Sequence, residues 1–67
     1  MNTLSLNGEP LDTMAPTLQA LLVERGYDLG SAFACAVNSV FVQRSQWPLQ
    51  ALCNGDRIDV VTPVTGG

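Results

Sequence analysis

Residues 3–26 read TLSLNGEPLDTMAPTLQALLVERG and contain the clearest secondary-structure signals of the chain. Leu4 and Leu6 alternate with polar residues, which is the period of a strand with one apolar face. Asn7-Gly8 is the strongest short signal for a two-residue hairpin turn, and residues 9–13 can return as a second strand. The chain is therefore predicted to open with a β-hairpin.

A single amphipathic helix is predicted to follow the hairpin. Thr17 is a good N-cap, and Gly26 is placed to stop the helix at its C-terminal end. Between them, Leu18, Leu21 and Leu22 recur at the spacing of one helical face, over about two turns. This apolar stripe needs a sheet against which it can pack.

Strand-like patterns return in the second half of the chain. Residues 34–38 and 40–43 are predicted as two short strands. Residues 57–62 are predicted as a last strand, which begins after a turn at residues 54–56. Residues 44–48 are predicted to form an irregular or short helical turn, because a proline closes that segment and bars regular continuation.

Three residues of this half have expected structural roles. Trp47 is expected in the core, because a domain this small must bury its few large side chains. Arg44 is expected to anchor the same turn by hydrogen bonds to carbonyls or carboxylates, with a partner contact as the alternative. Asp56 is expected to bond to the backbone of its own turn.

The predicted element order, β-β-α-β-β-β, indicates an α+β fold. This is the arrangement of the β-grasp, or ubiquitin-like, fold: a mixed sheet of about four to five strands with one main helix packed across one face. We expect residues 1–62 to form this domain and residues 63–67 to form a flexible C-terminal tail. Many unrelated functions use the fold, so the fold alone decides little.

Composition excludes several classes of function. The chain has 67 residues, so it forms one small domain with no room for a deep, closed active site. It contains no histidine and no lysine, which removes the commonest general base and the usual Schiff-base amine. Its net charge of −3 argues against nucleic acid and anionic membrane as targets. We expect a protein that is acted on by enzymes and is not itself an enzyme.

The two cysteines do not predict a metal site. Cys35 and Cys53 are far apart, match no metal-site spacing and have no histidine to complete a ligand set. Cys35 lies in an apolar run and is expected to be buried, and Cys53 beside a turn is also expected to be structural. Met1 is not followed by a signal peptide or a membrane span, so we expect a cytoplasmic protein with two free thiols.

The chain ends on Gly66-Gly67, after Pro63-Val64-Thr65. These five residues reach at most about 17 Å when extended, enough to place a terminal carboxylate in the pocket of another protein. Glycines without a Cβ allow a narrow channel to grip the backbone. Taken alone, two terminal glycines are more simply explained as a frayed chain end.

The last predicted strand leads into this tail. If Ile58 and Val60 face the helix, a period of two places Val61 on the opposite face. Val61 can then join Phe41 and Val64 in a small exposed patch where a partner docks. A solitary exposed apolar residue is also ordinary, so both interpretations of Val61 stay open.

Several motifs together carry a resemblance that spans nearly the whole chain. In order, they are Ala36-Val37-Asn38, Val42, Arg44-Ser45-Gln46-Trp47, Asn54-Gly55-Asp56-Arg57-Ile58 and Pro63-Val64-Thr65-Gly66-Gly67. In this order and spacing the sequence resembles the ThiS-type sulfur carriers of thiamine biosynthesis. It departs from the commoner pattern at Gln43, where a proline often precedes the arginine.

The resemblance implies a function for the tail. An activating enzyme similar to the ubiquitin-activating enzymes would adenylate the Gly67 carboxylate, and sulfur from a persulfide donor would convert it to a thiocarboxylate. Thiazole synthase would accept this sulfur. Gly66 would keep the tail thin enough to enter both partners. This chain would bind no cofactor, since the activating partner uses the ATP and Mg²⁺, and it would be a monomer when alone. The residues expected to bind partners are Phe41, Val61, Pro63, Val64 and Thr65.

Three alternatives remain open from the sequence. The small subunit of molybdopterin synthase is a β-grasp carrier with the same terminal chemistry and a pterin acceptor. A ubiquitin-like modifier would instead join Gly67 to lysines of target proteins. A plain binding module would use the sheet face and would keep its affinity after deletion of Gly66 and Gly67.

Overall fold

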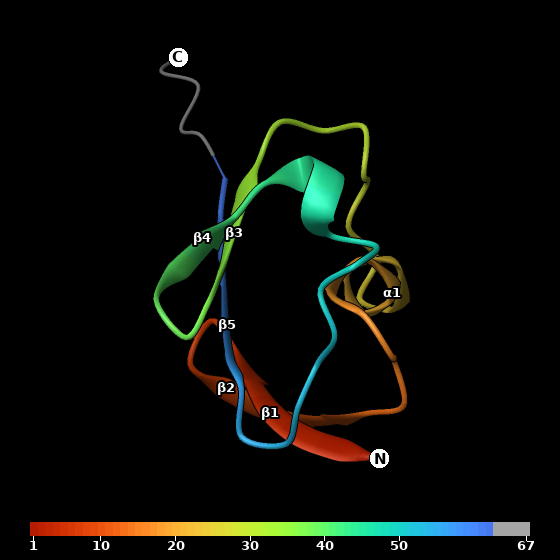
Figure 1. Ribbon diagram of the computed structural model, residues 1–67, viewed down its shortest axis with the longest axis vertical. Helices are drawn as coiled ribbons and strands as arrows, with labels where there is room; N and C mark the ends of the chain where they lie inside the picture. The colour runs from red at the N-terminus through yellow and green to blue at the C-terminus, as the bar shows by residue number, and fades with distance from the viewer. Residues whose placement is uncertain (63–67) are drawn as a thin grey trace.

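The computed structural model describes residues 1–62, which form a β-sheet with one α-helix against it (Figure 1). The elements are β1 (Asn2–Leu6), β2 (Glu9–Thr13), α1 (Leu18–Glu24), β3 (Ala34–Val37), β4 (Val40–Val42), the 3-10 helix η1 (Arg44–Gln46) and β5 (Arg57–Val61). The order β-β-α-β-β-β and the α+β β-grasp fold predicted from the sequence are confirmed.

The strands of the sheet lie in the order β2-β1-β5-β3-β4. β5 pairs in parallel with β1 and antiparallel with β3, and each hairpin is antiparallel, so the sheet is mixed. Figure 1 shows β5 between the β1–β2 hairpin and the β3–β4 hairpin. The strand that leads to residues 63–67 is therefore central and has a neighbour on both sides.

Each hairpin turns at two residues with positive φ. Asn7 and Gly8 have φ of 52° and 85°, and Asn38 and Ser39 have φ of 52° and 69°. Two consecutive positive φ values give a turn whose twist matches that of the flanking strands. Asn tolerates this conformation because its short polar side chain bonds locally, and the first turn was predicted on that basis.

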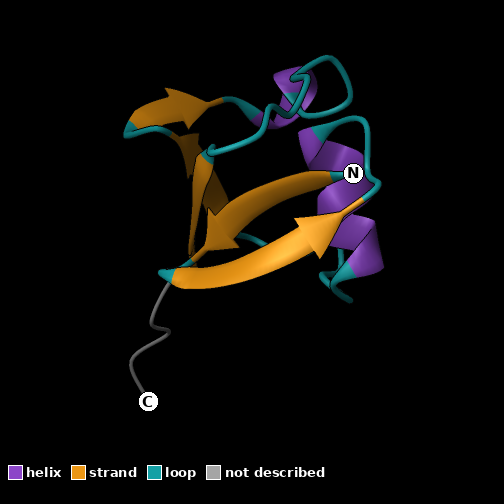
Figure 2. Ribbon diagram, turned by 90° about the horizontal axis from the view of Figure 1, so that it is seen from below, coloured by secondary structure: helices purple, strands orange, loops and turns teal. Residues whose placement is uncertain are grey.

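The helix α1 begins and ends as predicted. The Thr17 hydroxyl accepts a hydrogen bond from the Ala20 amide at 3.2 Å, and Gly26 follows the last turn with a φ of 86°. The side chains of Leu18, Leu21 and Leu22 are fully buried. Figure 2 shows α1 lying across one side of the sheet. The leucine stripe belongs to the same core cluster as the buried residues of the strands.

One core lies between the helix and the sheet. Leu4 and Leu6 contribute to it from β1, and Ile58 contributes from β5. Trp47 is only 2% exposed, and its Nε1–H donates to the Val42 carbonyl at 3.1 Å, so its predicted place in the core is confirmed. The indole is thereby buried without leaving its polar atom unpaired.

Three strands end one residue earlier than predicted. β3 ends at Val37 because Asn38 already has the positive φ of the turn. β4 ends at Val42 because the next residue is the N-cap of η1, which realises the predicted short helical turn. β5 ends at Val61, the last residue with a strand partner among residues 1–62.

Both cysteines are free thiols, but only one is buried. Cys35 is 1% exposed, as predicted. Cys53 is exposed, so the expected structural role is wrong for its side chain. Its backbone does support the turn, because its amide donates to an Asp56 carboxylate oxygen at 2.8 Å and its carbonyl accepts from the Asp56 amide at 3.1 Å.

Within residues 1–62, no helix combines the length and the apolarity that crossing a membrane requires.

Candidate functional site

The candidate site is the C-terminal end of β5 and the sheet surface around it. The tail residues expected to carry or guide the chemistry, Pro63, Val64, Thr65, Gly66 and Gly67, lie outside the described residues. The roles predicted for them stay predictions. What the structure does define is the surface from which the chain continues into residues 63–67.

Phe41 and Val61 lie on the same face of the sheet, opposite the helix. Phe41 pairs with Ala36, and Val61 pairs with Ala34. The two alanines are two residues apart on β3, so they share a face and lie between the larger side chains. Phe41 is 65% exposed and Val61 is 64% exposed. The structure thus places these two predicted partner-binding residues on one face of the sheet, on either side of the β3 alanines. We call this apolar surface the outer patch and define it as Ala34, Ala36, Phe41 and Val61.

A shallow apolar hollow adjoins the outer patch at the end of β5. It has a volume of about 320 Å³ and is lined by Ala32, Phe33, Ala34 and Val61. The sequence did not predict a part for Ala32 and Phe33, because they lie at the end of a loop with no periodic pattern. The feature that could have indicated them is the apolar sequence that begins in this loop and continues into β3.

The loop that supplies Phe33 is fixed by Arg44. The guanidinium donates to three main-chain carbonyls, those of Leu29, Ser31 and Phe33, the second at 2.6 Å and the third at 3.4 Å. Its central carbon also lies 5.2 Å from the centre of the Phe33 ring. The predicted anchoring role of Arg44 is confirmed, and its acceptors are carbonyls of the loop before β3.

Three aromatic rings of this region lie in contact, one pair stacked and one pair tilted. The Phe33 ring lies 5.0 Å from the Trp47 ring at an interplanar angle of 21°, and 5.5 Å from the Tyr27 ring at 40°. Offset aromatic contacts of this kind stabilise packing beyond the area that they bury. Phe33, which lines the hollow, is therefore fixed by its packing against the core residue Trp47.

Cys35 has no nucleophilic character near neutral pH. Burial raises the pKa of its thiol from 9.0 to about 11, and the nearby positive charge of Arg44 offsets only part of that rise. The thiolate is the reactive form of cysteine, so at neutral pH this buried thiol acts as a small apolar side chain.

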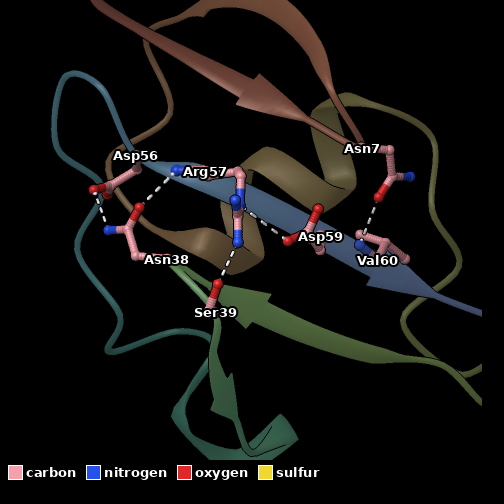
Figure 3. Close-up of polar contacts among 7 residues, drawn as sticks. All are labelled: Asn7, Asn38, Ser39, Asp56, Arg57, Asp59 and Val60. Carbon is pink, nitrogen blue, oxygen red and sulfur yellow. Dashed lines mark hydrogen bonds and ion pairs between the residues drawn. The ribbon is translucent and has the colours of Figure 1, made fainter.

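Polar side chains line the outer face along the first half of β5. Arg57 forms an ion pair with Asp59 at 3.5 Å and a hydrogen bond with the Ser39 hydroxyl (Figure 3). Both charged side chains are well exposed, so this pair contributes little to stability. The outer face thus changes from charged at the start of β5 to apolar at Val61.

The side chains of residues 1–62 offer no metal centre, since no three His, Cys, Asp or Glu residues gather there. The hollow has no charged lining residue either. The geometry fits the docking of an apolar protein surface better than the binding of a charged small molecule.

Comparison with known proteins gives one family and one fold. The ThiS family model matches residues 4–67. Among curated proteins, none matches the sequence. Among solved structures, the chain is similar to the crystal structure of a thiamine biosynthesis protein (ThiS) from Geobacter metallireducens, with a TM-score of 0.82 and 18% sequence identity. That similarity covers 97% of this chain and 99% of the other, and at this identity it supports the fold alone. Because the family match spans almost the whole sequence, the chain belongs to the ThiS family.

Proposed function

We propose that this chain is a sulfur carrier of thiamine biosynthesis that holds sulfur as a thiocarboxylate on Gly67. The observation that carries the proposal is the family match, which extends through the terminal Gly66 and Gly67. The absence of histidine and lysine from the sequence supports a co-substrate in place of a catalyst, because acid–base chemistry must then come from partner enzymes.

The chemistry begins with activation, because a carboxylate is a poor electrophile. A carboxylate oxygen of Gly67 attacks the α-phosphorus of ATP in the activating enzyme, which releases pyrophosphate and forms an acyl-adenylate. A persulfide sulfur then attacks the acyl carbon, and AMP leaves. A thiol cleaves the resulting acyl disulfide and releases the thiocarboxylate. ATP and Mg²⁺ belong to the activating enzyme in this scheme.

Delivery follows from the nature of the product. The thiocarboxylate sulfur is nucleophilic and remains covalently bound, so reactive sulfide is not released into solution. We propose that thiazole synthase accepts this sulfur and that the cytoplasm is where the transfer occurs. Gly66, with no side chain, lets the tail enter the narrow sites of both partners.

The outer patch supports the proposed docking step. Phe41 and Val61 are large, apolar and exposed on the face from which the chain continues into residues 63–67. Apolar and aromatic anchors of this kind dominate the energy of protein interfaces. We propose that the activating enzyme covers Phe41 and Val61, together with Pro63, Val64 and Thr65, while it holds Gly67 in its active site.

The direct test is ATP–pyrophosphate exchange by the activating enzyme in the presence of this chain. The full chain is expected to support exchange, and a chain that ends at Thr65 is expected to support none. A shortened chain that still supports exchange would contradict the proposal. The truncated chain should compete with the full chain, because it keeps the outer patch.

A further inference from the structure

The two ends of β5 are each held by an asparagine from a neighbouring hairpin turn (Figure 3). At the start of β5, the Asn38 side-chain oxygen accepts from the Arg57 amide at 2.9 Å, and its amide donates to Asp56 at 3.0 Å. Near the end, the Asn7 side-chain oxygen accepts from the Val60 amide at 2.7 Å. Both asparagines have a φ of 52°.

The side chain of Asn7 continues the hydrogen bonding to β5 beyond the end of β1. The parallel ladder between β1 and β5 has its last pair at Leu6 and Ile58. Asn7 still donates its amide to the Ile58 carbonyl at 2.8 Å, but its φ then turns the chain away into the hairpin. Its side-chain oxygen takes the place of the next main-chain acceptor and binds the Val60 amide. The hydrogen bonding along β5 is thereby extended toward the tail by two residues.

The position requires two properties that few residues combine. A φ of 52° is strained for most side chains but is tolerated by Asn, Asp and Gly. Of these, only Asn and Asp also carry an oxygen that can accept from Val60. Glycine at position 7 would keep the turn and lose the bond.

The consequence falls on the residues just before the tail. Val61 is held by β3 on one side, through its pairing with Ala34. On the other side, the nearest hydrogen bond is the one that the Val60 amide donates to the Asn7 side-chain oxygen, two residues before Thr62. Without this bond, the end of β5 keeps partners on one side only. Residues that loosen there must be ordered again when the tail is bound, which costs conformational entropy.

We propose that Asn7 is a positioning residue for acyl transfer at Gly67, which it serves by fixing the end of β5. This inference rests on the proposed function. Loss of the bond should weaken binding to the activating enzyme and leave the chemical step unchanged, because Asn7 takes no part in the reaction at Gly67.

The test compares three variants in the adenylation assay, at a temperature where all are folded. Asn7→Gly is expected to raise KM by about three- to tenfold, the range of one lost hydrogen bond, with kcat unchanged. Asn7→Asp keeps the acceptor and is expected to restore KM to within about twofold of the original chain. Asn38→Gly is the matched control, because it removes two hydrogen bonds from the other end of β5 and is expected to leave KM within the same twofold range.

Amide hydrogen exchange gives an independent readout. The Val60 amide should be protected in the original chain and in Asn7→Asp, and should exchange much faster in Asn7→Gly. A Val60 amide that exchanges like an unpaired amide in the original chain would overturn the inference, even if a variant failed to fold. So would equal KM values for Asn7→Gly and Asn38→Gly.

Failure of the proposed function has a different signature. If the original chain is not adenylated at all, the proposed function falls and the role of Asn7 in transfer falls with it. If the original chain is adenylated and Asn7→Gly behaves like it, only the inference about Asn7 is wrong.

Discussion

The guanidinium carbon of Arg44 lies 4.5 Å from the centre of the Trp47 ring. The same guanidinium binds the carbonyls of the loop before β3, so a single side chain joins that loop to the turn after β4. Since Phe33 and Ala32 line the hollow beside Val61, this contact shapes the surface at the end of β5. A core aromatic and a surface arginine together support the proposed docking site.

Replacing Arg44 by Lys should destabilise the fold by about 1 to 2 kcal/mol, because an ammonium group cannot stack as a plane or reach several carbonyls at once. Urea unfolding measures this free energy. Arg25→Lys is the matched control, since within residues 1–62 the exposed Arg25 side chain makes no hydrogen bond or ion pair, and it should change stability by less than about 0.5 kcal/mol. Equal effects of the two substitutions would refute the anchoring role of Arg44.

Replacing Trp47 by Phe should lower the free energy of unfolding by about 2 to 3 kcal/mol. The smaller ring leaves a cavity, and the Val42 carbonyl loses the donor that now binds it at 3.1 Å. Circular dichroism during urea unfolding measures the change. A loss below about 0.5 kcal/mol would mean that Trp47 is not central to the core.

The buried thiol predicts a loss of stability in alkaline solution. The pKa of Cys35 is about 11 in the folded chain and 9.0 when unperturbed. Because the folded state binds this proton more tightly, the contribution is fully present below pH 9 and is lost as the pH rises toward 11. Between pH 9 and 10.5 the loss amounts to roughly 1 to 2 kcal/mol.

Cys35→Ala is the control for that measurement, since it removes the titrating group. Its unfolding free energy should fall less steeply with pH above 9 than that of the original chain. Parallel pH profiles for the two proteins would show that Cys35 does not titrate in this range.

Substituting two exposed apolar residues on opposite faces of β4 tests the role of the outer patch. Phe41→Ala should lower kcat/KM for adenylation by about tenfold or more, because anchors of an interface carry most of its binding energy. Val40 is 66% exposed on the same strand but points to the other face, so Val40→Ala should leave adenylation unchanged. If Val40→Ala is the more damaging change, the partner docks elsewhere.

Much of the fold follows from local signals in the sequence. Asn7-Gly8, the Thr17 cap and the leucine stripe of α1 each act over a few residues, so the hairpin and the helix could be placed closely. Trp47 could be assigned to the core from the size of the domain alone. Strand ends were less certain, because they depend on which residues find partners in other strands.

The site was predictable only in part, for a physical reason. Period two along β5 places Val61 on the face away from the helix, but the pairing of Val61 with Ala34 is a long-range register that no local pattern specifies. The contacts of Arg44 with the loop before β3, and of Asn7 with Val60, also join residues that are distant in sequence. These contacts arise only from the folded topology.

The intact mass of the chain shows whether Gly67 carries sulfur. After incubation with the activating enzyme, ATP, Mg²⁺, a persulfide donor and a thiol, we expect a gain of about 16 Da, as sulfur replaces one oxygen. The gain should be confined to the C-terminal peptide and absent without ATP. An unchanged mass under conditions where the enzyme is active, or a gain located on Cys35 or Cys53, would show that Gly67 is not the sulfur carrier.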